Sequence, residues 1–316
     1  MMGEVQTVKP KREQVMFKDI IVGVTPTGID ECAVKAAVEF ATKFESRLYL
    51  THVAGMEQGW GSIEHLEPSG ETEQLKQKIT AMYGKYLETI PDSQITVVPG
   101  IPHSELLRLA RKKNTDLIVM GPHTKEYEEK RSKMWGMAGS TLERVSQRAR
   151  CPVMIVHEDV ECKEPLFANI IVATDFSEQA ECAVSYGGQM ARQYKASLTV
   201  MHVVEPGGMG KSECMTRMES EYSGRMDGVA AFKFEVSIGE PAIEILRMAR
   251  QGNADLLIMA HHSRETDPEK AFLGSTVSQV ALNAPCPTMS VNRHFDLRCG
   301  LMYDQTGAVA ATEAMA

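Results

Sequence analysis

The sequence lacks the features that mark a membrane protein or a nucleic-acid-binding protein. None of its apolar runs approaches the roughly 18 residues needed to span a bilayer, and residues 1–14 have no apolar centre of the kind found in a signal peptide. The formal net charge is −8, about −1 in residues 1–160 and about −7 in the rest, whereas nucleic acids and anionic membranes attract basic surfaces. We therefore expect a cytoplasmic protein with no nucleic-acid and no membrane partner.

Disulfide and metal signatures are also missing. The seven cysteines are an odd number, and none forms a Cys-x-x-Cys pair. Cys32 and Cys182 fall within apolar, helix-like patterns, which is typical of buried free thiols in a reducing compartment. His123, His261 and His262 have no further histidine or cysteine nearby at metal-ligand spacing. We therefore expect neither a metal site nor histidine-based catalysis.

What the sequence does contain is a long internal repeat. The tetrapeptide ECAV at 31–34 returns at 181–184, and FKDIIVGV at 17–24 corresponds to FANIIVAT at 167–174. Later matches keep the same order: PHSELLRLAR from Pro102 corresponds to PAIEILRMAR from Pro241, the GST at 139–141 to that at 274–276, and CPVMIV at 151–156 to CPTMSV at 286–291. Units of about 135 to 150 residues are domain-sized and much longer than solenoid repeats.

The repeat divides the chain into two expected domains. We refer to residues 16–158 as the first copy and to residues 166–293 as the second copy. The charged segment 157–166 is the expected linker between them. Residues 1–15 and 295–316 carry no sustained pattern, so we expect flexible termini there.

Strand-like and helix-like segments alternate within each copy. Short apolar runs at 19–24, 47–53, 94–100, 116–120 and 151–156 predict strands, and the segments between them have helical periodicity. The second copy repeats this order, with strands at 167–174, 197–203, 232–239, 255–259 and 286–291. Alternation of this kind predicts an α/β fold: two tandem, doubly wound, parallel five-stranded sheets with helices on both faces.

The segment EPGGMGKS at 205–212 ends like a phosphate-binding P-loop. However, Glu205 stands where that motif requires its first glycine, and the segment follows the second strand of its copy, not the first. We therefore expect an ordinary loop. In a doubly wound sheet, a ligand is instead expected at the carboxyl ends of the first and fourth strands, beside helix N-termini.

Several motifs together resemble those of the universal stress proteins. They are VATDFS at 172–177, a His-Val pair ending the second strand of each copy, the fourth strands DLIVM and DLLIM, and the closing GST and CPV or CPT segments. The resemblance covers nearly the whole chain. It implies a Rossmann-like fold of the adenine nucleotide alpha hydrolase type, doubled within one chain.

The resemblance also implies a nucleotide site in each copy, made from an acid after the first strand, a valine ending the second, and a glycine-containing loop around the phosphates. Neither copy has the full pattern. The candidate positions are Asp175, Val203, His261, Ser263, Gly274, Ser275 and Thr276 in the second copy, and Thr25, Val53, Gly121, Gly139, Ser140 and Thr141 in the first. Of these, Ser263 stands at a glycine position of the loop and Thr25 at the position of the acid. Because only the second copy has the acid, we expect it to be the better adenosine site.

The function implied is that of a non-enzymatic stress-response or regulatory protein that binds ATP or AMP weakly and does not require it. Two alternatives stay open: an interaction module that has lost nucleotide binding and acts on an unknown protein partner, and a slow ATP hydrolase. The family commonly dimerises through its last strand. We therefore expect the strands Cys151–Val156 and Cys286–Val291 to pair within this chain, which also covers two apolar edges.

Overall fold

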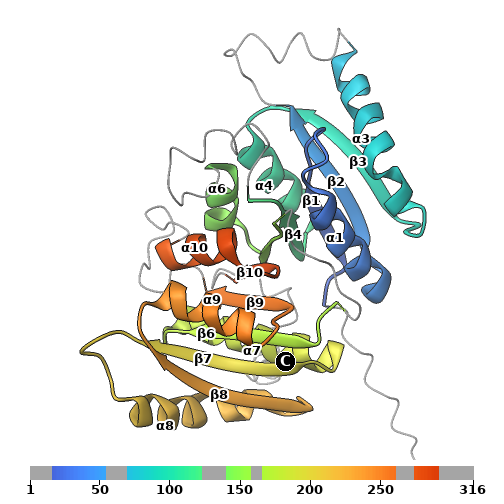
Figure 1. Cartoon of the computed structure of the whole chain (residues 1–316). Helices are drawn as coiled ribbons and strands as arrows, with labels where there is room; N and C mark the ends of the chain where they lie inside the picture. Colours follow the sequence, from blue (N-terminus) through green and yellow to red (C-terminus); the bar gives the residue numbers. More distant parts are fainter. Residues whose placement is uncertain (1–15, 55–69, 123–139, 158–165, 261–273, 292–316) are drawn as a thin grey trace, which may run out of the picture.

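The computed structural model describes residues 16–54, 70–122, 140–157, 166–260 and 274–291 (Figure 1). The candidate residues Gly139, His261 and Ser263 lie outside these ranges, as do both chain ends and most of the expected linker. In the described part of the chain, no helix combines the length and apolar character needed to cross a membrane.

Each copy alternates strands with helices in the predicted order. The first copy contains β1 (Asp19–Gly23), α1 (Glu31–Phe44), β2 (Arg47–Ala54), α3 (Glu71–Leu87), β3 (Ser93–Pro99), α4 (Pro102–Lys113), β4 (Leu117–Met120), α6 (Ser140–Arg148) and β5 (Val153–Ile155). The second copy contains β6 (Asn169–Thr174), α7 (Glu178–Tyr194), β7 (Ser197–Val204), α8 (Lys211–Tyr222), a 3-10 turn at Ser223–Met226, β8 (Ala231–Ile238), α9 (Pro241–Gln251), β9 (Leu256–Ala260), α10 (Ser275–Asn283) and β10 (Thr288–Val291).

Local sequence explains several helix ends. Pro102 and Pro241 stand at the starts of α4 and α9, where a missing backbone N–H costs no helical hydrogen bond. Ser177 precedes α7, and its Oγ accepts a hydrogen bond from the Ala180 backbone N–H at 3.1 Å. Asn114 ends α4 in the left-handed conformation, with φ of 52°, which asparagine tolerates better than most residues.

The strands form one ten-stranded sheet in the order β3-β2-β1-β4-β5-β10-β9-β6-β7-β8. Paired strands within each copy run parallel. Between the copies, β5 and β10 pair antiparallel, with Met154 opposite Met289. The α/β fold class is thus confirmed, and the two five-stranded sheets are joined edge to edge.

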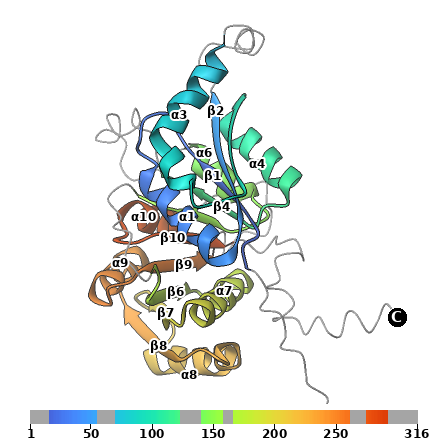
Figure 2. The ribbon, with the colours of Figure 1, turned by 90° about the vertical axis from the view of Figure 1, so that its right-hand side faces the viewer.

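Helices cover both faces of this sheet. Buried residues of α1, α3, α7 and α8 form one core cluster, and those of α4, α6, α9 and α10 form another on the opposite face. Figure 2 shows this arrangement in the first copy, where α1 and α3 lie on one side of β1 and β2 and α4 on the other. The fully buried strands explain why their sequences are continuous apolar runs rather than alternating patterns.

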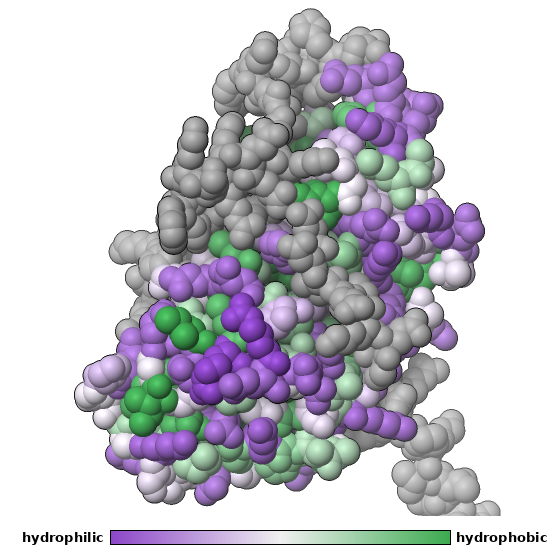
Figure 3. Space-filling view, in the orientation of Figure 1, coloured by the Kyte–Doolittle hydropathy of each residue, from purple (hydrophilic) through white to green (hydrophobic). Residues whose placement is uncertain are grey.

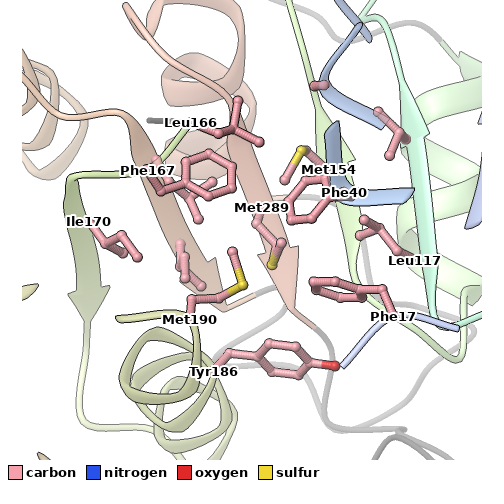
Figure 4. Packing of buried hydrophobic residues seen from close by; sticks show 14 of the residues in the cluster. Phe17, Phe40, Leu117, Met154, Leu166, Phe167, Ile170, Tyr186, Met190 and Met289 are labelled. Atoms are coloured by element: carbon pink, nitrogen blue, oxygen red, sulfur yellow. The ribbon is translucent and has the colours of Figure 1, made fainter. Parts of the chain in front are cut away.

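The junction between the copies is packed like a protein core. The ring of Phe40 from the first copy lies 5.4 Å from that of Phe167 in the second (Figure 4). The Phe167 ring also lies 5.0 Å from that of Tyr194. Phe17, Phe40 and Phe167 are each completely buried. Phe17 and Phe167 occupy equivalent positions of the repeat, so matching residues of both copies build a shared core.

The aspartates that open the fourth-strand motifs fix the amino-terminal edge of the sheet. Asp116 Oδ2 accepts hydrogen bonds from the backbone N–H groups of Lys18 and Asp19 at 2.9 and 3.0 Å. Asp255 Oδ2 accepts two equivalent bonds, both at 2.9 Å, at the start of β6. These aspartates lie at the amino-terminal ends of the strands, whereas the candidate site lies at the carboxyl-terminal ends. Their role is therefore structural.

Candidate functional site

In each copy the strand order reverses beside the first strand, because β1 lies between β2 and β4 and β6 lies between β7 and β9. Ligands of open α/β sheets bind at the carboxyl ends of strands at such a reversal. In the second copy, the register places Thr174 beside His202 and Ala173 beside Met259. Asp175, the next residue along the chain, therefore lies at the carboxyl edge where β6, β7 and β9 end together.

Asp175 is exposed and shapes its own loop. Its Oδ1 accepts hydrogen bonds from the Ser177 backbone N–H at 3.1 Å and from Ser177 Oγ at 2.6 Å. Ser177 in turn caps α7. Among the described residues, the structure gives the second carboxylate oxygen, Oδ2, no hydrogen-bond partner. Within the described ranges, that oxygen is therefore left unoccupied by the protein.

Phe176 holds the same loop by its ring. Its φ of 62° lies in the left-handed region, which is unfavourable for a bulky side chain and needs compensating contacts. The ring packs 4.5 Å from His202, stacks on Tyr222 at 6.1 Å, and carries the Arg217 guanidinium 4.2 Å from its centre. These contacts stabilise the conformation in which Asp175 points outward.

Tyr222 of α8 also joins this helix to the end of β6. The Tyr222 hydroxyl lies 2.8 Å from Thr174 Oγ1, which also accepts from the Phe176 backbone N–H at 3.1 Å. Burial raises the pKa of Tyr222 to about 12, so this hydroxyl keeps its proton at neutral pH. Side-chain contacts therefore fix Thr174, Asp175 and Phe176, three consecutive residues at the end of β6.

The start of α10 completes the described part of the second site. Gly274 has φ of 82°, a conformation that favours glycine, and the helix begins at the exposed Ser275, followed by the half-buried Thr276. The first turn of α10 contains no acidic residue, whereas that of α6 in the first copy contains Glu143. Because the free N–H groups of a helix start attract anions, α10 is the better of the two for a phosphate.

The first copy uses an acid differently. Asp30 is buried, and its Oδ2 accepts hydrogen bonds from the Thr25 backbone N–H at 2.6 Å and from Thr25 Oγ1 at 2.7 Å. Thr25 Oγ1 also lies 2.7 Å from Thr27 Oγ1. The hydroxyl at the position equivalent to Asp175 is therefore committed within its own loop.

The other candidate residues of the first copy lie at the same edge of the sheet. The register of β1 and β2 brings Thr25 close to Val53, which is buried, and Gly121 directly follows β4. Ser140 and Thr141 open α6. Within the described ranges, the structure thus brings together the predicted strand-end residues of each copy.

The histidines at the ends of the second strands have backbone partners. His52 Nδ1 lies 2.9 Å from the carbonyl oxygen of Val24, and His202 Nδ1 lies 2.8 Å from that of Thr174. Burial lowers the pKa of His52 below its usual value.

Gly207 and Gly210 of the P-loop-like segment belong to an exposed turn that follows β7, which agrees with the expected loop.

Sequence reasoning missed Asp30, Phe176 and Tyr222. For Asp30 a signal existed, because it stands directly before α1 at the repeat position that Ala180 occupies in the second copy. Nothing in the sequence distinguished Phe176 or Tyr222 from ordinary core residues.

Within the residues that the structure describes, no group of histidine, cysteine and acidic side chains is arranged to hold a metal ion.

The structure is that of a doubly wound α/β protein with one strand-order reversal in each copy. Comparison with known proteins gives its family. The model of the universal stress protein family matches residues 16–157 and 167–292, which is most of the chain. The chain therefore belongs to the universal stress protein family, with two of its domains in tandem.

Individual relatives agree with this assignment. The universal stress proteins MJ0531 and MJ0577 of Methanocaldococcus jannaschii are 28% and 24% identical over 151 and 160 residues. Each match covers 45% of this chain, and they cover 82% and 96% of the relatives. The crystal structure of a universal stress protein from Archaeoglobus fulgidus matches 88% of this chain and 97% of its own, with a TM-score of 0.63 at 20% identity. This last likeness shows the fold of the whole tandem unit.

Proposed function

We propose that the chain is a non-enzymatic regulatory protein of the stress response that binds an adenine nucleotide, ATP or AMP, weakly and mainly in its second copy. The observation that carries this proposal is the exposure and hydrogen bonding of Asp175. Its carboxylate is exposed at the carboxyl edge of the sheet, one oxygen fixes the loop, and the other has no partner in the described part of the chain. A preformed, charged acceptor of this kind suits a ribose hydroxyl or the amino group of a base.

The neighbouring features suit the rest of a nucleotide. Val203 is half-buried beside Asp175 and offers apolar contact to a base or sugar. The start of α10, with Gly274 and Ser275, offers backbone N–H groups to a phosphate. The first copy has no matching acid available, because Asp30 is buried and bonded to Thr25.

Isothermal titration of ATP and AMP into wild type and Asp175→Ala tests this proposal. Losing a hydrogen bond to a charged group costs roughly 1.5 to 3 kcal/mol, so we expect about ten- to a hundredfold weaker binding in the variant. Asp175→Asn is the matched control for loop shape, since its amide oxygen still accepts from Ser177. Thr25→Ala is the control in the first copy and is expected to change affinity less than about twofold.

Other outcomes would favour the alternatives. Unchanged affinity in Asp175→Ala, with a loss in Thr25→Ala, would place the site in the first copy. If neither nucleotide binds wild type at millimolar concentration, the interaction module becomes the better description. Phosphate release from ATP that is proportional to protein concentration and lost in Asp175→Ala would replace the non-enzymatic part of the proposal by slow hydrolysis.

A further inference from the structure

The strand β8 forms one outer edge of the ten-stranded sheet. It pairs with β7 over all of its eight residues, and no described strand pairs with its other edge. Phe232 and Ile238 on this strand are 44% and 63% exposed. A long, regular edge strand with exposed apolar side chains is a template for pairing with another strand. Figure 3 shows hydrophilic and hydrophobic residues intermixed over this half of the molecule, so the edge is not set in a uniformly polar surface.

The opposite edge of the sheet is protected in a way that β8 is not. The edge strand of the first copy, β3, ends in Pro99, which cannot donate a backbone hydrogen bond. Its residues are mostly half-buried. In contrast, β8 has the sequence AFKFEVSI, without proline, and every residue has a backbone N–H.

The two faces of β8 differ in character. Phe232, Phe234 and Val236 alternate along one face, where the rings of Phe232 and Phe234 lie 5.7 Å apart and Val236 joins the core beneath α8. Lys233 and Glu235 lie on the other face, with Lys233 Nζ 3.9 Å from a carboxylate oxygen of Glu235. Both charged side chains remain accessible, at 62% and 35% exposure. The strand therefore carries an apolar row, exposed at Phe232 and buried at Val236, and a row with one charge of each sign.

We propose that β8 is the docking edge for a second copy of this chain, paired antiparallel about a two-fold axis at Phe234. In this register Phe234 faces its own symmetry mate, and Phe232 faces Val236 of the other chain. On the opposite face, Lys233 of each chain faces Glu235 of the other. Apolar residues thus meet apolar residues, and opposite charges meet twice.

Neighbouring registers lack this complementarity. Centring the pair on Lys233 would place two lysines opposite each other, and centring it on Glu235 would oppose two carboxylates, which is unfavourable. Arg247 of α9 also faces Glu235 on this side of the strand, but it is hydrogen-bonded to Glu244 and Gln251. The charge pattern of β8 therefore selects one register of self-pairing.

The molecule already contains an edge contact of this geometry. At the junction of the copies, β5 and β10 pair antiparallel, with Met154 opposite its repeat equivalent Met289. Pairing through β8 would repeat this antiparallel pairing of equivalent strands between two chains, and it would extend one continuous sheet across both. It would leave the carboxyl edge near Asp175 outside the contact, because β8 pairs along its outer side only.

Charge reversal tests the register directly. We expect sedimentation equilibrium of the full chain at micromolar concentration to give twice the 34.9 kDa of one chain for wild type. In Lys233→Glu and in Glu235→Lys, two attractive pairs become repulsive, and dimerisation should weaken by about tenfold or more. The double variant exchanges the charges and should recover the wild-type mass. An equimolar mixture of the two single variants should form heterodimers, because one chain then presents two carboxylates to two ammonium groups.

Lys78→Glu is the matched control, since Lys78 is exposed on α3 of the first copy, far along the sheet from β8. It should leave the dimer intact, and circular dichroism should show all variants folded. A wild-type chain that is monomeric at these concentrations would overturn the proposal. So would a dimer whose mass is unaffected by both single reversals, because it would then use another surface.

Discussion

The loops that follow β1 and β6 occupy the same place in the repeat but use their acids in opposite ways. In the first copy, Asp30 is buried and holds Thr25 by two hydrogen bonds. In the second copy, Asp175 is exposed and keeps one oxygen free of the described residues. The comparison shows that one fold can place a carboxylate either inside its loop, bonded to that loop, or at the strand end, where it is exposed.

The burial of Asp30 gives the first prediction, which has the largest expected effect. Burial raises the pKa of Asp30 to about 6 from an ordinary value of 3.8, although hydrogen bonds from Thr25 oppose the shift. The folded state therefore binds a proton more tightly than the unfolded state between about pH 4 and pH 6. The contribution of Asp30 to the free energy of unfolding should decrease as the pH rises through this window, by up to about 3 kcal/mol.

Asp30→Asn isolates this effect, because its amide oxygen can still accept from Thr25 while its charge cannot change. Urea denaturation at pH 4, 5, 6 and 7 should show that the stability difference between wild type and Asp30→Asn changes through the window. The raised pKa of Asp116 acts in the same direction but is common to both proteins. Parallel pH profiles for the two proteins would mean that Asp30 is not desolvated as the structure shows.

The second prediction compares how closely the first helix of each copy approaches the sheet. Gly187 of α7 leaves no room for a methyl group, because an added Cβ would overlap the side chain of Val172. The equivalent position in α1 is Ala37, which is completely buried. We expect Gly187→Ala to lower the free energy of unfolding by roughly 1 to 3 kcal/mol through overpacking, although alanine favours a helix.

Ala37→Gly is the matched change in the other direction. It should cost about 1 kcal/mol from the lower helix propensity of glycine, together with a small loss of contact. Both variants can be measured by thermal and urea denaturation. A stabilised Gly187→Ala protein would show that α7 can move away from β6, so the close approach in the second copy would not be a requirement of the fold.

Much of this fold was predictable from sequence, and the site was predictable only in part. The repeat, the apolar strand runs and the helical periodicities each reflect burial on both sheet faces, which forces a pattern on many residues at once. The role of Asp30 depends on one loop folding inward, and that of Phe176 on a left-handed backbone held by Tyr222 and Arg217. Single contacts of this kind leave no periodic pattern in the sequence, whether they lie within one loop, as between Asp30 and Thr25, or join distant segments, as between Phe176 and Tyr222. His261, Ser263 and Gly139 remain predictions, because they lie outside the described residues.

The third prediction asks whether the two loops can be exchanged. The variant Thr25→Asp with Asp30→Ala gives the first copy the residues that the second copy has at Asp175 and Ala180. The new acid can bond to Thr27, as Asp175 bonds to Ser177, and present its second oxygen at the strand end. In an Asp175→Ala background, these two changes should strengthen AMP binding by about fivefold, which is less than Asp175 provides because Val53 is more buried than Val203.

Calorimetry with AMP, rather than ATP, keeps this test on the adenosine contact and away from the acidic first turn of α6. Asp30→Ala alone, in the same background, is the control and should bring no gain, since it removes the buried acid without supplying an exposed one. If the exchanged protein is folded but binds no better than this control, the acid after the first strand does not by itself create the adenosine contact. The difference between the copies would then lie in the loops before α6 and α10, and Gly274→Val would be expected to abolish binding where Asp175→Ala does not.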